Sequence, residues 1–173
     1  MPLINLGMGH RDAIASLEAE LFARPFTVAS LASLFAGKAF AGYALTDNDS
    51  DDNVENLGGN PSGDHGGDHG GDHGENIISY ILLSQVLDEA EILSLGTAPD
   101  HQGKGHARRL LTETCEILLH AGICKMYLDV AASNVAARAL YSGCGFDESG
   151  RRAGYYGTAP HRQDAIIMSK ALI

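Results

Sequence analysis

Apolar residues along this chain of 173 residues follow two spacings, which predict helices in some segments and strands in others. A recurrence every three or four residues places apolar side chains on one face of a helix. The pattern predicts four helices: one between Asp12 and Pro25, one after Thr27, one ending at about Ala121, and one that starts at Ser133 and Asn134 and ends at Gly143. Asp12 and Thr27 are the expected N-caps, because their side-chain oxygens can accept a hydrogen bond from the first turn.

Short apolar runs between these helices predict strands. They cover residues 2–6, 39–45, 77–85, 90–97, 124–130, a segment from residue 146 onward that leads into a loop with Tyr155 and Tyr156, and 164–168. Strands and helices in this order are typical of an α/β architecture, in which a right-handed crossover joins two parallel strands. The sequence therefore predicts one α/β domain over residues 1–173.

A glycine-rich turn stands between the predicted strand 90–97 and the third helix. Pro99 ends the strand, because proline has no amide hydrogen for a sheet ladder, and Gly103 and Gly105 follow it. The first amides of a helix have no partner within the helix, and the helix dipole adds partial positive charge there. A strand, a glycine turn and a helix N-terminus in succession predict a site for an anion such as phosphate.

The spacing of this turn excludes two phosphate-binding motifs and fits a third. A P-loop requires Ser or Thr after its lysine, but Lys104 is followed by Gly105. A dinucleotide fingerprint requires a glycine where the chain has Arg108. The pattern Gln-x-x-Gly-x-Ala, formed by Gln102, Gly105 and Ala107, resembles the acetyl-coenzyme A loop of the GNAT superfamily of N-acetyltransferases. An ordinary strand-to-helix turn is the alternative.

The acidic character of the chain, a formal charge of −10 at pH 7, belongs mainly to one segment. Residues 47–75 hold nine of the 22 acidic residues and no Lys or Arg. Residues 46–76 contain three copies of Gly-Asp-His-Gly and almost no large apolar residue. Such a segment cannot bury enough surface to offset its ordering entropy, so we expect a disordered loop. Because strands 39–45 and 77–85 flank it, the loop is expected as an insertion in a hairpin, where length is tolerated.

The repeats leave two interpretations open. His65, His69 and His73, with the neighbouring aspartates, supply the imidazoles and carboxylates that transition metals bind. A repeat that persists only because it is soluble is the simpler interpretation. We therefore expect the protein to need no metal for its activity.

Composition limits the cellular context. The chain has no run of 18 apolar residues that would span a membrane, and no basic stretch followed by an apolar core that would mark a signal peptide. Cys115, Cys124 and Cys144 include no Cys-x-x-Cys pair, so we expect reduced thiols in a cytoplasmic protein. Without a basic surface, neither nucleic acid nor a membrane is an expected partner. We expect a monomer.

Several motifs in one order resemble the RimI-type bacterial acetyltransferases, which acetylate the N-terminal alanine of a small-subunit ribosomal protein. These motifs are residues 81–91, the glycine turn, Tyr-Leu-Asp-Val-Ala-Ala-Ser-Asn at 127–134, Ala-Leu-Tyr at 139–141, Gly-Phe at 145–146, and residues 155–168. The match covers residues 77–170 well and the first 45 loosely, and 46–76 have no counterpart. The resemblance implies the GNAT fold, a mixed sheet of about six to seven strands with splayed central parallel strands and about four flanking helices.

The resemblance also implies where acetyl-coenzyme A would bind as the cosubstrate. Its pantetheine arm would pair with the backbone of strand 90–97, and its pyrophosphate would lie against the amides of the glycine turn. The residues implied at the cofactor are Leu95, Gly96, Thr97, Gly103, Lys104, Gly105, His106, Ala107, Arg108 and Asn134. Solvated surface side chains are the alternative for Lys104 and Arg108, and a helix N-cap is an equally good and compatible role for Asn134.

For catalysis the resemblance implies two residues. Asp129 stands where the family has a glutamate proposed as general base; it is one methylene shorter, and we expect it to act through water. Tyr141 matches the family's general-acid tyrosine, whose phenol can protonate the departing thiolate. A structural hydrogen-bonding role for Asp129 and core packing for Tyr141 are the alternatives. Cys144 has no histidine beside it in sequence and is not an expected nucleophile.

Departures from the family pattern fall near the expected peptide groove and concern the acceptor. Ala131 stands where the family has an arginine, and Arg151 and Arg152 come one place earlier than the family's usual pair. Tyr155 and Tyr156 either wall the groove or pack in the core. The expected acceptor is the N-terminal peptide of a ribosomal protein. A small-molecule amine as acceptor, and a non-catalytic acyl-coenzyme A or metal-binding module, are the alternatives.

Overall fold

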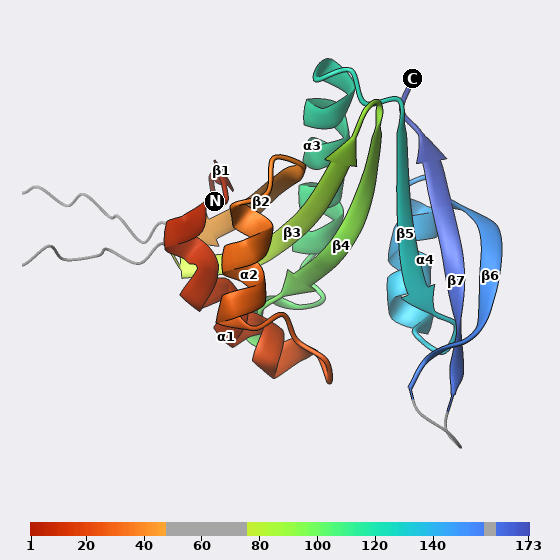
Figure 1. The fold of residues 1–173 in the computed structure, drawn as a ribbon, viewed down its shortest axis with the longest axis horizontal. Helices are drawn as coiled ribbons and strands as arrows, with labels where there is room; N and C mark the ends of the chain where they lie inside the picture. Colours follow the sequence, from red (N-terminus) through yellow and green to blue (C-terminus); the bar gives the residue numbers. More distant parts are fainter. Residues whose placement is uncertain (48–75, 158–161) are drawn as a thin grey trace, which may run out of the picture.

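The computed structural model describes residues 1–47, 76–157 and 162–173, and in them seven strands form one mixed sheet in the order β1-β2-β3-β4-β5-β7-β6 (Figure 1). The strands are β1 (Leu3–Asn5), β2 (Phe40–Asp47), β3 (Asn76–Val86), β4 (Glu89–Thr97), β5 (Lys125–Ala131), β6 (Asp147–Tyr156) and β7 (Gln163–Ala171). The helices are α1 (Arg11–Leu21), α2 (Val28–Phe35), α3 (His106–His120) and α4 (Val135–Gly143). The predicted α/β architecture is confirmed.

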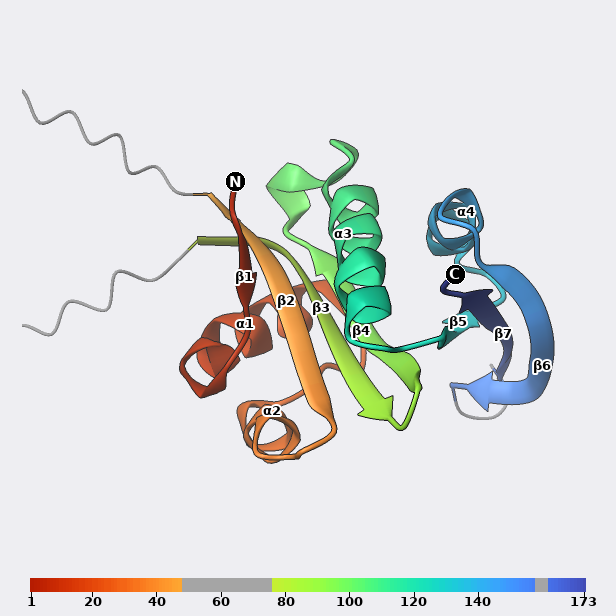
Figure 2. The same ribbon diagram turned by 90° about the horizontal axis from the view of Figure 1, so that it is seen from above.

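Among the described elements, α3 and α4 cover one face of the sheet and α1 and α2 cover the other (Figure 2). Helix α3 buries Leu110, Leu111 and Leu118 against apolar side chains of β3, β4 and β5. Helices α1 and α2 pack on the other face, where Ile14 and Leu31 belong to a second buried cluster. The apolar spacing along each helix therefore decides which side it turns to the sheet. No helix among the described residues is long and apolar enough to cross a membrane.

Strands β2 and β3 form the predicted hairpin. They pair antiparallel, with Phe40 opposite Ser84 at one end and Asp47 opposite Asn76 at the other. The Gly-Asp-His repeats and all but the ends of the predicted loop 46–76 lie outside the described residues. The expectations of disorder and of metal binding therefore concern a part of the chain that the structure does not describe.

The parallel strands β4 and β5 are joined over only part of their length. Their pairing runs from Glu89 with Lys125 to Ile92 with Leu128. Beyond this point β4 continues to Thr97 and β5 to Ala131, and Figure 1 shows the two strands diverging. The predicted splay is confirmed, and it separates the sheet into two halves that meet at one end.

Two local predictions are wrong. Asp12 is not the cap of α1, because a 3-10 turn (Met8–His10) leads directly into the helix and places Asp12 in its first turn. Tyr155 and Tyr156 lie in β6 rather than in a loop, because the ladder with β7 continues as far as the pair of Tyr156 with Gln163. Thr27 does cap α2, since its side-chain oxygen accepts a hydrogen bond from the Ser30 amide.

Candidate active site

The N-terminus of α3 keeps its main-chain donors free of side-chain caps. Gly103 and Gly105 have φ values of +72° and +85°, a left-handed backbone that glycine adopts without strain, and no atom lies within 4 Å of a Cβ built on either. Within the described residues, Gly105 at the N-cap makes no side-chain cap bond, and the first turn holds no acidic residue. The Nε2 atom of His106 is buried and has no hydrogen-bond partner in the described part of the chain. Unfilled amides, open space and an orphaned imidazole nitrogen fit an anionic group.

Two side chains of this region hold the turn in place. The Gln102 amide donates to the carbonyl oxygen of Thr97 at 3.1 Å and so ties the turn to the end of β4. Arg108 donates through Nη1 to the carbonyl oxygen of Gly143 at 2.8 Å and so joins α3 to the end of α4. The Arg108 side chain therefore links two helices, an arrangement that sequence analysis did not anticipate. Lys104 is exposed on the turn.

The splayed half of β4 contains Leu95, Gly96 and Thr97, which pair with β3 but not with β5. Glycine is required at position 96, because a Cβ there would lie 2.6 Å from a ring carbon of Tyr80. The three residues thus lie beside the opening between β4 and β5, which is where a pantetheine arm was expected. Gly96 has a packing role in addition to any role toward a ligand.

A buried carboxylate supports this half of β4 from the face of α1. Glu18 is 1% exposed and accepts hydrogen bonds from the Tyr80 hydroxyl at 2.8 Å, from the Phe26 amide at 3.0 Å, and from the Ser94 hydroxyl. Burial first, and then the charge of Glu18, raise the pKa of Tyr80. Three donors compensate for the burial of a charge. Sequence analysis did not identify this network, because the position of Glu18 in the helix is typical of a polar residue on an exposed helix face.

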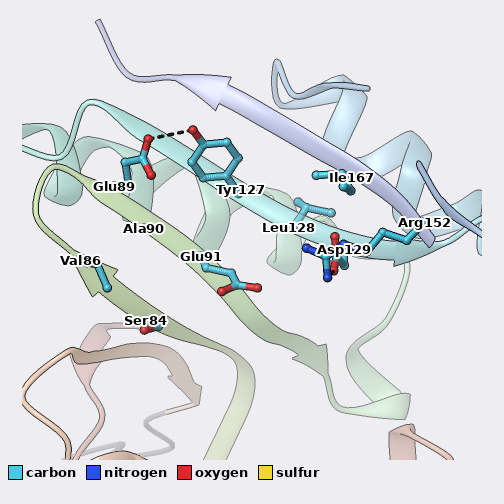
Figure 3. Close-up of a pocket in the computed structure, with 10 residues that line it drawn as sticks. All are labelled: Ser84, Val86, Glu89, Ala90, Glu91, Tyr127, Leu128, Asp129, Arg152 and Ile167. Carbon is cyan, nitrogen blue, oxygen red and sulfur yellow. Dashed lines mark hydrogen bonds and ion pairs between the residues drawn. The ribbon is translucent and has the colours of Figure 1, made fainter. Parts of the chain in front are cut away.

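A groove of about 290 Å³ lies across β4 and β5 where their pairing ends. Ala90 and Ile92 of β4 pack toward α3, so the alternate residues Glu89 and Glu91 lie on the opposite face. Figure 3 shows the groove with its lining residues, Ser84, Val86, Glu89, Ala90, Glu91, Tyr127, Leu128, Asp129, Arg152 and Ile167. It holds three carboxylates and one guanidinium. Glu91 was missed by sequence analysis, although the acid–apolar alternation of residues 89–92 could have indicated it.

Asp129 lies in this groove and is held by a neighbouring strand. Its carboxylate forms an ion pair with Nη1 of Arg152 at 2.9 Å, and its side chain is 14% exposed. The Tyr156 hydroxyl donates to the main-chain oxygen of Asp129 at 3.1 Å. Burial first, and then the charge of Asp129, raise the pKa of Tyr156. Asp129 therefore has two fixed partners, Arg152 and Tyr156. Sequence analysis expected both near the peptide groove but did not pair them with Asp129.

Tyr141 is buried on α4, where its ring packs edge to face on Phe146 with centroids 5.8 Å apart. Burial first, and then the charge of Tyr156, raise its pKa, so the phenol stays protonated at neutral pH. Tyr156 thus lies near both Tyr141 and Asp129. Tyr141 lies in the buried cluster with Leu128 and Val130, so its packing role is confirmed, whereas the Asp129 side chain alternates with these residues and lies on the groove side of the sheet.

The remaining predicted residues occupy defined places. The Asn134 side chain accepts a hydrogen bond from the Ala137 amide at 3.1 Å and so caps α4. Arg151 and Arg152 are neighbours with different partners: Arg151 pairs with Asp164 at 3.2 Å, whereas Arg152 pairs with Asp129. The Tyr155 ring lies 5.2 Å from the Arg152 guanidinium. Within the described residues, no group of three or more His, Cys, Asp or Glu side chains is arranged to hold a metal ion.

Comparison with known proteins agrees with this arrangement. The family model for the acetyltransferase (GNAT) family matches residues 29–146, which are more than half of the chain. The chain belongs to the acetyltransferase (GNAT) family. The matched region includes the glycine turn, the splayed strands, Asp129 and Tyr141. The GNAT fold expected from the sequence is confirmed by the structure and by this match.

Curated relatives share one half of the chain more closely. The ribosomal protein bS18-alanine N-acetyltransferase of Escherichia coli K12 is 41% identical over 91 residues, which are 53% of this chain and 62% of that protein. The N-alpha-acetyltransferase RimI of Mycobacterium tuberculosis is 41% identical over 68 residues, 39% of this chain and 41% of that protein. The chain thus matches less than two thirds of the length of these relatives.

Solved structures match nearly the whole chain. The crystal structure of the ribosomal-protein-S18-alanine N-acetyltransferase from Escherichia coli superposes with a TM-score of 0.78 and 28% identity, and the alignment covers 99% of this chain and 93% of that one. Spermidine N-acetyltransferase from Vibrio cholerae in complex with CoA and spermine gives a TM-score of 0.73 at 23% identity, over 99% of this chain and 95% of that one. At that identity the second similarity shows the fold alone.

Proposed function

We propose that this protein transfers the acetyl group of acetyl-coenzyme A to a protein N-terminal α-amine, namely the N-terminal alanine of a small-subunit ribosomal protein. The observation that carries the proposal is the opening between β4 and β5, with a turn suited to an anion at one side and a carboxylate-lined groove across its other face. The similarity to the bS18-alanine N-acetyltransferase supports the choice of acceptor.

In this proposal the cosubstrate binds to the main chain. The amides of Gly103 to Arg108 receive the diphosphate at the positive end of α3, with Lys104 adding charge and the free Nε2 of His106 nearby. The pantetheine arm pairs with the β5-facing edge of Leu95 to Thr97, which has no strand partner among the described residues. Asn134, which caps α4, is assigned to the same cosubstrate. No metal takes part.

The groove side of the opening receives the amine. The α-ammonium has a pKa near 8 and must lose a proton before it can attack. Asp129 accepts this proton through a water molecule. The ion pair with Arg152 keeps the Asp129 side chain, which is one methylene shorter than the family's glutamate, in one orientation. The neutral nitrogen then forms the C–N bond at the acetyl carbonyl as the C–S bond breaks.

Tyr141 acts as the general acid in this scheme. The sulfur leaves as a thiolate and takes the phenolic proton of Tyr141, while the nitrogen releases its second proton to solvent and solvent restores the phenol. A raised pKa keeps that phenol protonated at neutral and alkaline pH. This suits a general acid, which must carry its proton at the start of each turnover. No covalent enzyme intermediate is required.

The decisive experiment is mass spectrometry of ribosomal protein N-termini from cells with and without this protein. On deletion we expect an alanine N-terminus to lose one acetyl group, a mass decrease of about 42 Da. The acetyl group should return when wild-type protein is restored, but not when the Asp129→Asn variant is restored. Unchanged N-termini would overturn the proposed acceptor.

Purified protein distinguishes the alternative functions. Acetyl transfer from acetyl-coenzyme A is compared between a short peptide that begins with alanine, the same peptide with a blocked N-terminus, polyamines and aminoglycosides. We expect activity on the free peptide alone. Transfer to a polyamine or aminoglycoside would identify a small-amine acetyltransferase, and cofactor binding without transfer to any acceptor would identify a non-catalytic module.

A further inference from the structure

The acceptor of the proposed reaction arrives with a positive charge. An α-amine with a pKa near 8 is mostly ammonium at neutral pH, yet it reacts only after losing a proton. The groove must therefore attract a cation before it deprotonates one. Asp129 is poorly placed to do this alone, because its carboxylate is already paired with Arg152 at 2.9 Å.

A second carboxylate of the groove is also engaged. Glu89 accepts a hydrogen bond from the Tyr127 hydroxyl at 2.8 Å. The Lys125 ammonium lies 4.7 Å from the centroid of the Tyr127 ring, and Tyr127 first and Glu89 last raise the pKa of Lys125. Glu89 thus belongs to a cluster with its own cation, Lys125, at the end of the groove where β4 and β5 are still paired.

Glu91 differs from both. It is exposed, and in the part of the chain that the structure describes its side chain has neither a hydrogen bond nor an ion pair. It pairs in register with Tyr127 on β5, and only the pair of Ile92 with Leu128 follows before the two strands diverge. Figure 3 shows its side chain on the same side of the sheet as Asp129 and Arg152, facing them across the gap between the strands. Of the three carboxylates that line the groove, Glu91 is the one whose side chain has no partner among the described residues.

We propose that Glu91 binds the protonated amine of the acceptor and delivers it to the water beside Asp129. This inference rests on the proposed function and adds a residue to its acceptor site. Glu91 makes a charge-assisted hydrogen bond to the ammonium, whereas Asp129 takes the proton. The two steps fall to different carboxylates because Arg152 neutralises one of them and leaves the other free.

The pH dependence of acceptor binding tests this role. The charged groups around Glu91 are Asp129 and Arg152 across the groove, and Glu89 and Lys125 where β4 and β5 are still paired. Its neighbours in register, Tyr127 on β5 and Ser84 on β3, are uncharged. A carboxylate is ionised from about pH 6 to about pH 9.5, but the α-amine loses its charge over this range. The contribution of Glu91 must therefore be present at the acidic end and fade toward the alkaline end.

The experiment compares Glu91→Gln with Glu116→Gln, which removes the same charge from an exposed position on α3, on the other face of the sheet. At about pH 6.5 we expect Glu91→Gln to raise KM for the alanine-initiated peptide roughly three- to tenfold, with kcat changed less than twofold. At about pH 9.5 the KM ratio to wild type should approach one. Glu116→Gln should change KM less than twofold at either pH, and Glu91→Asp should keep most of the wild-type affinity.

Three outcomes would overturn the inference: a KM ratio for Glu91→Gln that stays the same at both pH values, an equal effect of Glu116→Gln, or no effect of Glu91→Gln. Thermal unfolding of each variant shows that it is folded, and Glu91→Lys, which should raise KM at about pH 6.5 further than Glu91→Gln, provides a second measurement. If the wild-type protein does not acetylate the peptide, the proposed function itself fails. If the wild type is active and Glu91→Gln behaves like it, only the role of Glu91 fails.

Discussion

The two sides of the β4–β5 opening are built from different parts of the chain. At the start of α3 the ligand-binding groups are main-chain amides, exposed by two left-handed glycines and left uncapped. Across the opening the groove presents side chains, among them Asp129 paired with Arg152 and Glu89 paired with Tyr127. The difference teaches where substitutions matter. The first side tolerates most side-chain changes that add no negative charge or bulk, whereas the second depends on individual functional groups.

The largest expected effect is on the side built from side chains. Asp129→Asn should lower kcat about 100-fold while the affinity for acetyl-coenzyme A changes less than twofold, because the amide cannot take the proton and the turn at α3 is untouched. Steady-state kinetics and calorimetric titration of the cofactor measure the two quantities. Asp129→Glu should retain substantial activity. Asp164→Asn, which breaks the neighbouring pair with Arg151, is the matched control. A parallel loss of cofactor affinity would erase the contrast between the two sides.

The converse effect is expected at the start of α3. His106→Asp places a carboxylate in the first turn of α3. There its interaction with the helix dipole stabilises the folded protein by about 0.3–1 kcal/mol, but its charge repels a diphosphate. We expect the Kd of acetyl-coenzyme A to rise roughly 30-fold while the melting temperature does not fall. Val28→Asp, at the first position of α2 on the other face of the sheet, is the control and should leave the Kd unchanged. An unaltered Kd in His106→Asp would contradict the binding of the diphosphate at this turn.

Tyr141 has both a packing role and a proposed chemical one, so its effect should be smaller. Tyr141→Phe keeps the ring contact with Phe146 and removes only the hydroxyl, and kcat should fall about tenfold, because a thiolate leaves readily even without an acid. Since the pKa of Tyr141 is raised, the wild-type kcat should show no loss of this acid up to about pH 10. An alkaline fall that begins near neutrality and disappears in Tyr141→Phe would show that the phenol ionises earlier than its burial implies.

The smallest effect separates the two roles of Asn134. Removal of its cap on α4 by Asn134→Ala should cost about 1 kcal/mol of unfolding free energy, measured by chemical denaturation. Asn134→Asp keeps a capping oxygen and should restore that stability. If Asn134 is a cap alone, the Kd of acetyl-coenzyme A stays at the wild-type value in Asn134→Ala; a several-fold rise would confirm that it also contacts the cofactor.

Much of the fold follows from local patterns. The apolar spacing from Leu110 to Leu118 predicted α3, Gly103 and Gly105 predicted the turn before it, and the strands around the acidic segment predicted a hairpin that β2 and β3 form. The errors occur where another part of the chain decides the outcome. Asp12 lost its capping role to the preceding 3-10 turn, and the tyrosines at the end of β6 became strand because β7 lies beside them.

The sequence by itself determined the elements, the uncapped turn and the presence of Asp129 and Tyr141, because spacing and residue type act over a few neighbouring positions. Only the tertiary structure decided which groups meet. It placed Arg152 rather than Arg151 on Asp129 and buried Glu18 beneath Ser94 and Tyr80. It also left the Glu91 side chain without a partner among the described residues, on the same side of the sheet as Asp129. The physical reason is that strand register and the divergence of β4 from β5 bring together residues tens of positions apart, and no local pattern records that pairing.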